Sequence, residues 1–324
     1  AIIEFIRKNI YRFNRLDVAW FGGEPLVAID VIENLSRHFI EICKQHRIPY
    51  TSNITTNGYL LNHDNMKKLL KCHITSFQIT VDGLEKTHNH QKPLATGGGT
   101  YQTVLDNLRN IRDNIKTKML RIIIRTNVTK EIYADFDEYM EFYSNEFGND
   151  ERFSFFIRPV MDWGGESIKQ MYCSMVDEMT IENLYDRIIK AGKLKRFDAH
   201  AGFLTKGGTM CAAGKLNYFT VEPDGKVHKC SQIFDSSYRT QVGYISLEGN
   251  MILDECECGK WLINKNTCGE ENCEFSGNCM SEFCPQLRVA KKLDKAVCPH
   301  EKINIEYILK LLDIDNTNFV VIGD

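Results

Sequence analysis

The chain has 324 residues, 43% of them hydrophobic, and its 40 Lys and Arg against 43 Asp and Glu leave a formal net charge of −3. This size suggests about two domains of a globular enzyme, and the even spread of charge disfavours a nucleic acid partner. The apolar runs are far shorter than the ~20 residues of a membrane-spanning helix, so we expect no membrane partner and a cytoplasmic location.

The chain opens with a pattern typical of an amphipathic helix over residues 1–12. Glu4, Arg7 and Lys8 interrupt the apolar residues there, which is unlike a secretory signal. The helix pattern starts at Ala1 with no initiator Met and no capping residue before it. We therefore expect the natural start of the protein to lie upstream.

From residue 16 to about residue 158, β-rich runs alternate with amphipathic stretches, as in a parallel sheet whose strands return through helices. The expected strands are Asp17–Phe21, Tyr50–Thr55, Ser76–Val81, Leu120–Asn127 and Phe153–Arg158, and the expected helices are Ile29–Gln45, Asp64–Lys71, Thr100–Ile115 and Ile132–Phe147. Together with the opening helix, these strands and helices make about six β/α units. We predict an α/β fold, a partial (β/α)6 barrel over residues 1–165, with functional residues just after the strand ends.

A second module follows. We expect a helical connector over residues 166–205 with a helix near 180–195, a cysteine-rich domain over 206–300, and a tail over 301–324 with a helix at 303–312. Nine of the 12 cysteines lie between Cys211 and Cys298, which marks the second domain.

The first two expected strands end in motifs that suit a ligand. Gly22-Gly23-Glu24-Pro25 combines glycines that permit close backbone approach with a carboxylate that can bind an ammonium group. Thr55-Thr56-Asn57-Gly58 offers hydroxyls and an amide. Taken alone, this second motif is better explained as a strand-to-helix turn with Asn62 or Asp64 as the cap.

The next two strands carry polar inner faces. Side chains alternate along a strand, so Gln78, Thr80 and Asp82 share one face, as do Arg125 and Asn127. Buried polar groups cost ~1–3 kcal/mol each without partners, and a ligand could supply those partners. Arg125 suits a carboxylate, which it can bind through two hydrogen bonds.

Two further features are less specific. Gly97-Gly98-Gly99 is best explained as a hinge, with Thr100 as a helix N-cap, because no Lys-Ser or Lys-Thr pair follows it. His88 and His90 could share one side of a strand, but no third metal ligand is evident near them. We expect them at the surface or in contact with substrate.

The cysteine-rich domain predicts bound metal. A β-hairpin with its turn at Glu222-Pro223-Asp224-Gly225 should return Cys230 towards Cys211. The remaining candidate ligands are Cys256, Cys258, Cys268, Cys273, Cys279, Cys284 and Cys298. Iron–sulfur ligation is favoured over zinc, because no pair has the two intervening residues typical of zinc knuckles, and disulfides rank last.

Together these motifs resemble radical S-adenosylmethionine (SAM) enzymes with a C-terminal SPASM domain, a group that includes peptide maturases and anaerobic sulfatase-maturating enzymes. The resemblance implies that Gly22, Gly23 and Glu24 bind the SAM amino group and that Thr56, Asn57 and Gly58 form the next strand-end motif. Val81-Asp82-Gly83 resembles the family's motif at the end of the following strand. Thr80 and Arg125 would lie near the SAM carboxylate.

The same resemblance implies two auxiliary 4Fe-4S clusters with interleaved ligands. Cys211, Cys230 and Cys284 would hold one cluster, whose fourth ligand is Cys256 or Cys258, or whose open position faces substrate. The other cluster would be held by Cys268, Cys273, Cys279 and Cys298.

The family's Cys-x3-Cys-x2-Cys motif, which holds the SAM-cleaving cluster, is absent from this sequence. We expect that further 4Fe-4S cluster on an upstream segment. The implied activity is maturation of a ribosomally made peptide by a 5'-deoxyadenosyl radical, with a peptide or protein substrate and an electron donor such as flavodoxin or ferredoxin.

Two alternatives stay open. The first is sulfatase maturation, where the family has an Asp at the position of Ser231. The second is a non-catalytic iron–sulfur or zinc-binding scaffold.

Overall fold

The computed structural model describes residues 1–160, 167–177, 180, 183–184, 186–188, 211–232, 240–262, 273 and 284–289. The connector helix expected near 180–195 lies mostly outside these residues, and the helix expected at 303–312 lies wholly outside them. The proposed domain boundaries therefore stay predictions.

The first sheet has five parallel strands in chain order, β1 (Leu16–Trp20), β2 (Tyr50–Thr56), β3 (Ile74–Thr80), β4 (Arg121–Val128) and β5 (Phe153–Pro159). All five expected strands are confirmed, each with slightly shifted ends. Sequential parallel strands need a crossover between each pair, and helices supply most of each crossover. The predicted α/β architecture is thus confirmed for this part of the chain.

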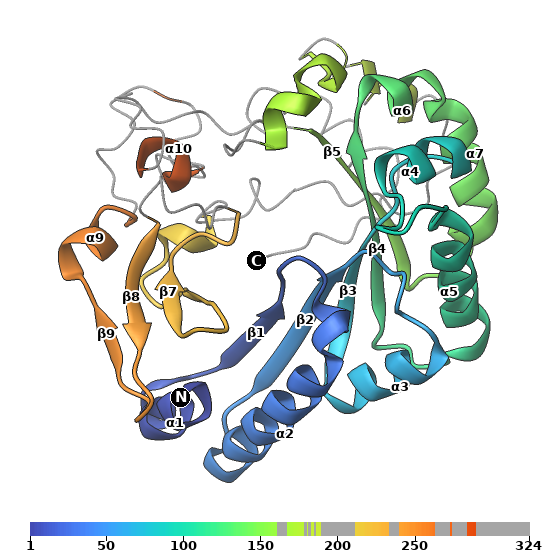
Figure 1. The fold of residues 1–324 in the computed structure, drawn as a ribbon. Helices are drawn as coiled ribbons and strands as arrows, with labels where there is room; N and C mark the ends of the chain where they lie inside the picture. Colours follow the sequence, from blue (N-terminus) through green and yellow to red (C-terminus); the bar gives the residue numbers. More distant parts are fainter. Residues whose placement is uncertain are drawn as a thin grey trace.

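Helices cover one face of this sheet, and Figure 1 shows α2, α3, α5 and α7 along it. The helices of residues 1–147 are α1 (Ile2–Asn9), η1 (Ile10–Arg12), η2 (Pro25–Ala28), α2 (Ile29–His46), α3 (His63–Lys71), α4 (Glu85–Gln91), α5 (Tyr101–Asn114), α6 (Lys130–Ala134) and α7 (Phe136–Phe147). The prediction of one helix over 132–147 was wrong. Asp135 ends α6 and begins α7, in keeping with the preference of Asp for helix ends over helix interiors.

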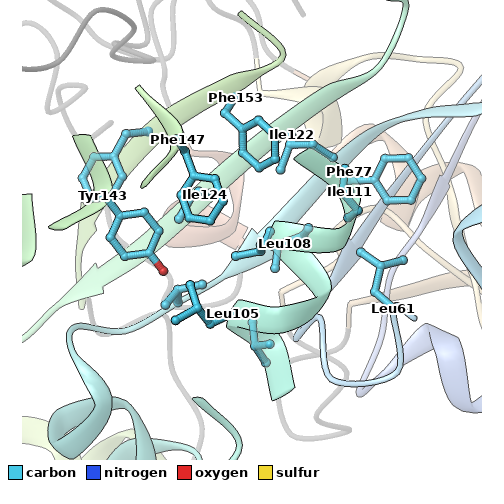
Figure 2. Packing of buried hydrophobic residues seen from close by; sticks show 14 of the residues in the cluster. Leu61, Phe77, Leu105, Leu108, Ile111, Ile122, Ile124, Tyr143, Phe147 and Phe153 are labelled. Atoms are coloured by element: carbon cyan, nitrogen blue, oxygen red, sulfur yellow. The ribbon is translucent and has the colours of Figure 1, made fainter. Parts of the chain in front are cut away.

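The hydrophobic core lies between the sheet and these helices. Along β4, Ile122, Ile124 and Val128 are buried, whereas the alternate residues, Arg125 among them, are only partly buried. Figure 2 shows side chains of α5 and α7 packed against β3, β4 and β5. The alternation leaves the polar side chains on the opposite, inner face of the sheet.

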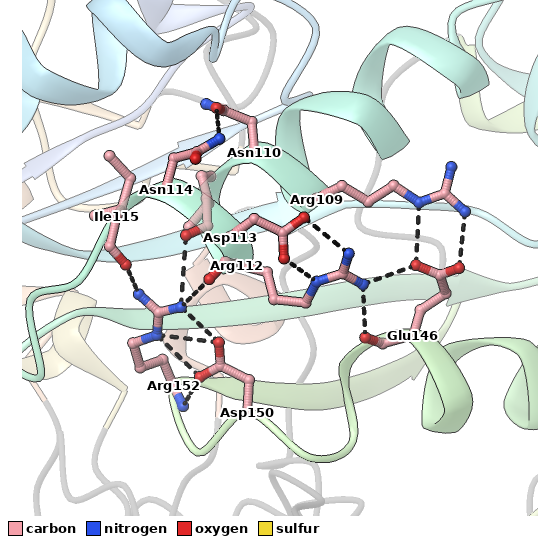
Figure 3. Close-up of polar contacts among 10 residues, drawn as sticks. Arg109, Asn110, Arg112, Asp113, Asn114, Ile115, Glu146, Asp150 and Arg152 are labelled. Carbon is pink, nitrogen blue, oxygen red and sulfur yellow. Dashed lines mark hydrogen bonds and ion pairs between the residues drawn. The ribbon is translucent and has the colours of Figure 1, made fainter.

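A polar network fastens α5 to α7 and to the start of β5 (Figure 3). Arg109 binds Glu146 through two hydrogen bonds of 2.7 and 3.0 Å, and Arg112 donates to the same carboxylate at 3.0 Å. Arg152 pairs with Asp150 and donates to the Arg112 carbonyl at 2.8 Å. The Arg109 hydrogen bonds lower the pKa of Glu146. These contacts hold β5 in place at the end of the sheet remote from the polar strand ends.

The second sheet is antiparallel and contains β6 (Thr220–Val221), β7 (Lys226–His228), β8 (Gln241–Ile245) and β9 (Met251–Leu253). Three short helices accompany it, namely η5 (Ala212–Gly214), α9 (Glu255–Gly259) and α10 (Pro285–Val289), and η3 (Ser167–Ser174) precedes it in the chain. The predicted hairpin is confirmed, with Gly225 donating its N–H to the Glu222 carbonyl at 2.9 Å. This sheet carries the cysteines.

Helix α1 joins the two parts of the molecule. Ile2 and Phe5 pack against the apolar clusters of both. The ammonium group of Lys8 donates to the Glu248 carbonyl at 2.6 Å, in the turn between β8 and β9. Figure 1 shows α1 at the base of this turn. Across the residues that the structure describes, no helix has the length and apolar character needed to cross a membrane.

Candidate functional site

The Glu24 side chain lies at the carboxyl end of β1, and the neighbouring strand holds it there. Its Oε1 accepts hydrogen bonds from the Thr56 hydroxyl at 2.7 Å and from the Leu26 N–H at 3.0 Å. Its Oε2 accepts from the Asn57 N–H at 2.8 Å. The structure thus brings together two motifs that the sequence places 33 residues apart, and these bonds fix the carboxylate in one orientation.

Glycines leave space around this carboxylate. Gly22 has a φ of +149°, and no atom would lie within 4 Å of a side chain added at Gly22 or Gly23. Gly58 is needed for a different reason, because its φ is +78° and an added Cβ would lie 2.8 Å from the Ile79 side chain. The first motif is therefore open to a ligand, and the second is tightly packed. The turn after it is capped by Asn62, as the sequence indicated.

Asp82 follows β3 and is satisfied by protein groups, not left for a ligand. It is 3% exposed, and its Oδ1 accepts from the Asn127 N–H at 2.8 Å and from the Asn127 side chain at 3.2 Å. Lys92 lies 3.4 Å from its other oxygen. The expectation that a ligand supplies hydrogen-bond partners for the polar side chains of β3 was therefore wrong for Asp82. Its side chain instead connects the end of β3 to β4.

Thr80 and Arg125 are neighbours across β3 and β4 in the parallel register. The Arg125 guanidinium donates through Nε to Asn127 at 3.1 Å. Burial, together with the nearby charge of Arg158, lowers the pKa of Arg125. A guanidinium in this setting is stabilised by an anion, and it has five N–H donors with which to bind one.

His88 is not at the surface, which was one of the two locations expected for it. It lies in α4, is 1% exposed, and accepts a hydrogen bond from the Asp82 N–H at 3.2 Å. Burial lowers the pKa of His88 to about 4, so the ring is neutral near pH 7. His90 is exposed and lies 3.3 Å from Glu131. The two side chains therefore differ in burial and in partners, although they are two residues apart.

The Thr100 side chain does not cap α5. The Asn89 side chain accepts hydrogen bonds from the N–H groups of Thr100 and Tyr101 at 2.8 and 2.9 Å. The Thr100 hydroxyl donates instead to the Lys92 carbonyl at 2.6 Å. The sequence spacing did not indicate that Asn89, a residue of α4, caps the first turn of α5.

In the second module, three cysteines lie in or against one apolar cluster, and a fourth precedes a helix that packs beside it. Cys230 belongs to the apolar cluster of this sheet, and Cys211 and Cys258 pack against it. The buried Cys284 begins the segment of α10, which packs against η5 beside Cys211. The sulfur of Cys230 lies 3.6 Å from Gln286 Oε1 in α10.

Cys256 and Cys258 differ in their surroundings. Both lie in the short helix α9, where residues two apart point in different directions. Cys256 is exposed, whereas Cys258 is partly buried against the apolar cluster. Burial raises the pKa of Cys258, and the positive charge of Lys229 opposes that shift.

Two buried polar side chains accompany these cysteines. Lys229 is 1% exposed, and its ammonium group donates to the carbonyls of Lys215 and Tyr218 at 2.5 and 2.8 Å. Trp261 is fully buried in the same apolar cluster, and its indole N–H has no acceptor. Neither residue carries a motif, so the sequence offered no signal for them.

The described cysteines are all free of disulfide bonds. Within the described ranges, no three His, Cys, Asp or Glu side chains converge as ligands of a single metal ion. The thiolates of an iron–sulfur cluster bind different iron atoms and stand further apart than the ligands of one ion. Several thiols that form no disulfide, beside an indole N–H that has no acceptor among the described residues, fit such a cluster. Cys268, Cys279 and Cys298 lie outside the described residues, and Cys273 is described only as partly buried.

Residues 1–143 match the family model described as the Radical SAM superfamily. This part of the chain is a radical SAM domain. No curated protein matches the sequence.

Solved structures share the fold over most of the chain. Native anSMEcpe with bound AdoMet and Kp18Cys peptide matches with a TM-score of 0.65 and 16% identity, over 97% of this chain and 87% of the other. Native anSMEcpe with bound AdoMet alone matches with a TM-score of 0.67 and 16% identity, over 98% of this chain and 89% of the other. Streptococcus suis SuiB bound to S-adenosylmethionine matches with a TM-score of 0.54 and 15% identity, over 92% of this chain and 68% of the other.

Proposed function

We propose that this protein is a radical SAM enzyme that modifies a ribosomally made peptide and that carries auxiliary 4Fe-4S clusters in a C-terminal SPASM domain. SAM would bind at the carboxyl ends of β1 to β4. One electron from a donor such as flavodoxin or ferredoxin would cleave SAM to methionine and a 5'-deoxyadenosyl radical, which abstracts a hydrogen atom from the substrate.

The observation that carries this proposal is the fixed carboxylate of Glu24. Three hydrogen bonds from Leu26, Thr56 and Asn57 hold it in one orientation at the open glycine motif. A cationic ammonium group suits that position. Thr80 on β3 and Arg125 on β4, two and three strands further along the sheet, would bind the carboxylate at the other end of the SAM amino acid.

For the first auxiliary cluster, we propose Cys211, Cys230, Cys258 and Cys284 as the ligands. The grouping of Cys211, Cys230 and Cys284 around η5 and α10 supports this set. Cys258 is chosen over Cys256 because it faces the apolar cluster that contains Cys230. For the second cluster, Cys268, Cys273, Cys279 and Cys298 stay the proposed ligands. A bound cluster would anchor substrate or accept an electron from it.

Peptide modification is proposed because solved structures with the same fold include one with bound AdoMet and a peptide. Sulfatase maturation ranks second, because Ser231 follows Cys230 where an acidic base is expected for that reaction. A non-catalytic metal scaffold does not explain why three hydrogen-bond donors converge on the Glu24 carboxylate at the open glycine motif.

SAM affinity tests the assignment of Glu24. Glu24→Ala, made in the enzyme with its complete natural sequence, should weaken SAM binding by about 1.5–3 kcal/mol, which is the value of a charged hydrogen bond. Iron content should not change. Glu33→Ala is the control, because Glu33 pairs with Lys68 at 3.2 Å on the outer helices. Unchanged SAM affinity in Glu24→Ala would remove this residue from the site, and metal binding without any SAM binding would favour the scaffold.

A further inference from the structure

Trp261 has a buried polar group without a partner. Its side chain is 0% exposed and lies in the apolar cluster formed with Val227, Val242 and Ile245. Among the residues that the structure describes, the indole N–H has no hydrogen-bond acceptor. The backbone around it is ordinary, since the Trp261 N–H donates to the Cys258 carbonyl at 3.1 Å and closes the last turn of α9.

An orphaned buried donor is costly, on the order of 1–3 kcal/mol. Buried polar groups nearly always have a partner, and each exception needs an explanation such as an ion, a water or a redox group. Trp261 is one of several such side chains among the described residues, and its place in the apolar cluster that contains Cys230 distinguishes it from Ser36, Tyr50, Tyr143 and Ser154. Trp20 shows the usual situation in this protein, because its indole N–H donates to the Ser52 hydroxyl at 3.1 Å. Trp261 therefore needs an acceptor that belongs to its surroundings.

Those surroundings contain sulfur. Cys230 lies in the same apolar cluster as Trp261, and Cys211 and Cys258 pack against that cluster. Trp261 is also three residues beyond Cys258, in the turn that follows α9. Three of the four proposed ligands of one auxiliary cluster thus lie in or against the apolar cluster of Trp261. Of the described tryptophans, Trp261 is the one whose indole N–H lacks an acceptor.

We propose that the Trp261 indole N–H donates a hydrogen bond to a thiolate or sulfide sulfur of this auxiliary cluster and raises its reduction potential. The inference rests on the proposed function, because it requires the cluster. Hydrogen bonds to sulfur stabilise the more negative, reduced state of an iron–sulfur cluster. Lys229, whose buried charge interacts with Cys258, acts in the same direction. In this proposal Trp261 changes the reduction potential of the cluster and does not contact the substrate.

The test is the midpoint potential of the auxiliary cluster in Trp261→Phe, measured anaerobically in the reconstituted chain by redox titration. Phenylalanine keeps the aromatic packing and removes the N–H. We expect iron content to be retained and the equilibrium constant for reduction to fall about tenfold, a decrease of about 59 mV for one electron. Trp20→Phe removes a matching indole N–H from the first sheet and should leave the potential unchanged.

An unchanged potential in Trp261→Phe, with iron retained, would overturn this inference and leave the proposed function intact. A wild-type chain without iron and sulfide would overturn the cluster itself, which is a separate failure. If Trp261→Phe fails to hold iron, the wild-type protein decides the question through the NMR signals of its three labelled indole N–H groups. The Trp261 signal should be shifted and broadened when the paramagnetic cluster is loaded, and an unmoved signal would contradict the hydrogen bond.

Discussion

The Thr56 hydroxyl donates a hydrogen bond of 2.7 Å to Glu24 Oε1, so a side chain from β2 orients the carboxylate that follows β1. If Glu24 binds the SAM ammonium group, Thr56→Val should weaken SAM binding by roughly 1–2 kcal/mol, because one hydrogen bond to a charged group is lost. Calorimetric titration with SAM measures the effect.

Thr51→Val is the matched control for that experiment. Thr51 lies at the opposite end of the same strand, where its exposed hydroxyl donates to Asp17. Equal SAM affinities in the wild type and Thr56→Val would show that the hydrogen bond does not serve SAM binding.

His88 predicts an acid-sensitive fold. Its pKa falls from 6.5 to about 4 on folding because the ring is buried. As the pH drops from 6.5 towards 4, His88 binds a proton in the unfolded chain but stays neutral in the folded chain. The free energy of unfolding therefore falls across that pH range, by roughly 3 kcal/mol from this residue. His88→Gln should lack this loss.

The measurement is the free energy of unfolding of wild type and His88→Gln at several pH values. The difference between them should shrink as the pH falls from 6.5 to 4. His90→Gln is the control, because the His90 side chain is 76% exposed. A difference that is independent of pH for His88→Gln would contradict the neutral buried ring.

Lys229 should stabilise the second module even without metal. In Lys229→Met, the carbonyls of Lys215 and Tyr218 lose their donor, and we expect the free energy of unfolding to fall by about 2–4 kcal/mol. Urea denaturation measures the loss. Lys226→Met, which removes an exposed lysine paired with Asp224 at 2.8 Å, should have a much smaller effect, and equal effects would argue against the buried ammonium.

Gly249 should matter for the contact between the two parts of the molecule. Its φ is +79°, and an added Cβ would lie 2.5 Å from the Glu4 side chain and 2.6 Å from the Phe5 nitrogen. Gly249→Ala should loosen α1 and increase its hydrogen exchange. Gly259→Ala, which would meet no atom within 4 Å, should leave α1 protected, and equal protection in both variants would contradict the close packing.

Much of the fold could be predicted because its signals are local. Alternating apolar residues placed all five strands of the first sheet, and the Pro-Asp-Gly turn placed the β6–β7 hairpin. The break at Asp135 was missed because the apolar pattern continues through it. Functional residues were expected just after the strand ends, and Glu24, Thr56 and Asn57 do lie at one edge of the sheet, but the hydrogen bonds between them were not predicted.

Contacts over long sequence distances could not be predicted in the same way. The clamp between Asp82 and Asn127 spans 45 residues, and His88 is buried only because α4 folds back under β3. Neither Lys229 nor Trp261 belongs to a motif. Their burial depends on how η5, β7 and α9 pack, which the composition of each segment does not reveal.

The most direct test of the central claim is the metal content of this chain after anaerobic reconstitution. Two auxiliary 4Fe-4S clusters require about eight irons and about eight sulfides per chain, with the broad absorbance of iron–sulfur clusters. We expect that stoichiometry in the wild type and a loss of roughly four irons in Cys258→Ala, while Cys256→Ala retains them. Stoichiometric zinc without sulfide would contradict the proposal that this radical SAM domain is joined to an auxiliary-cluster domain.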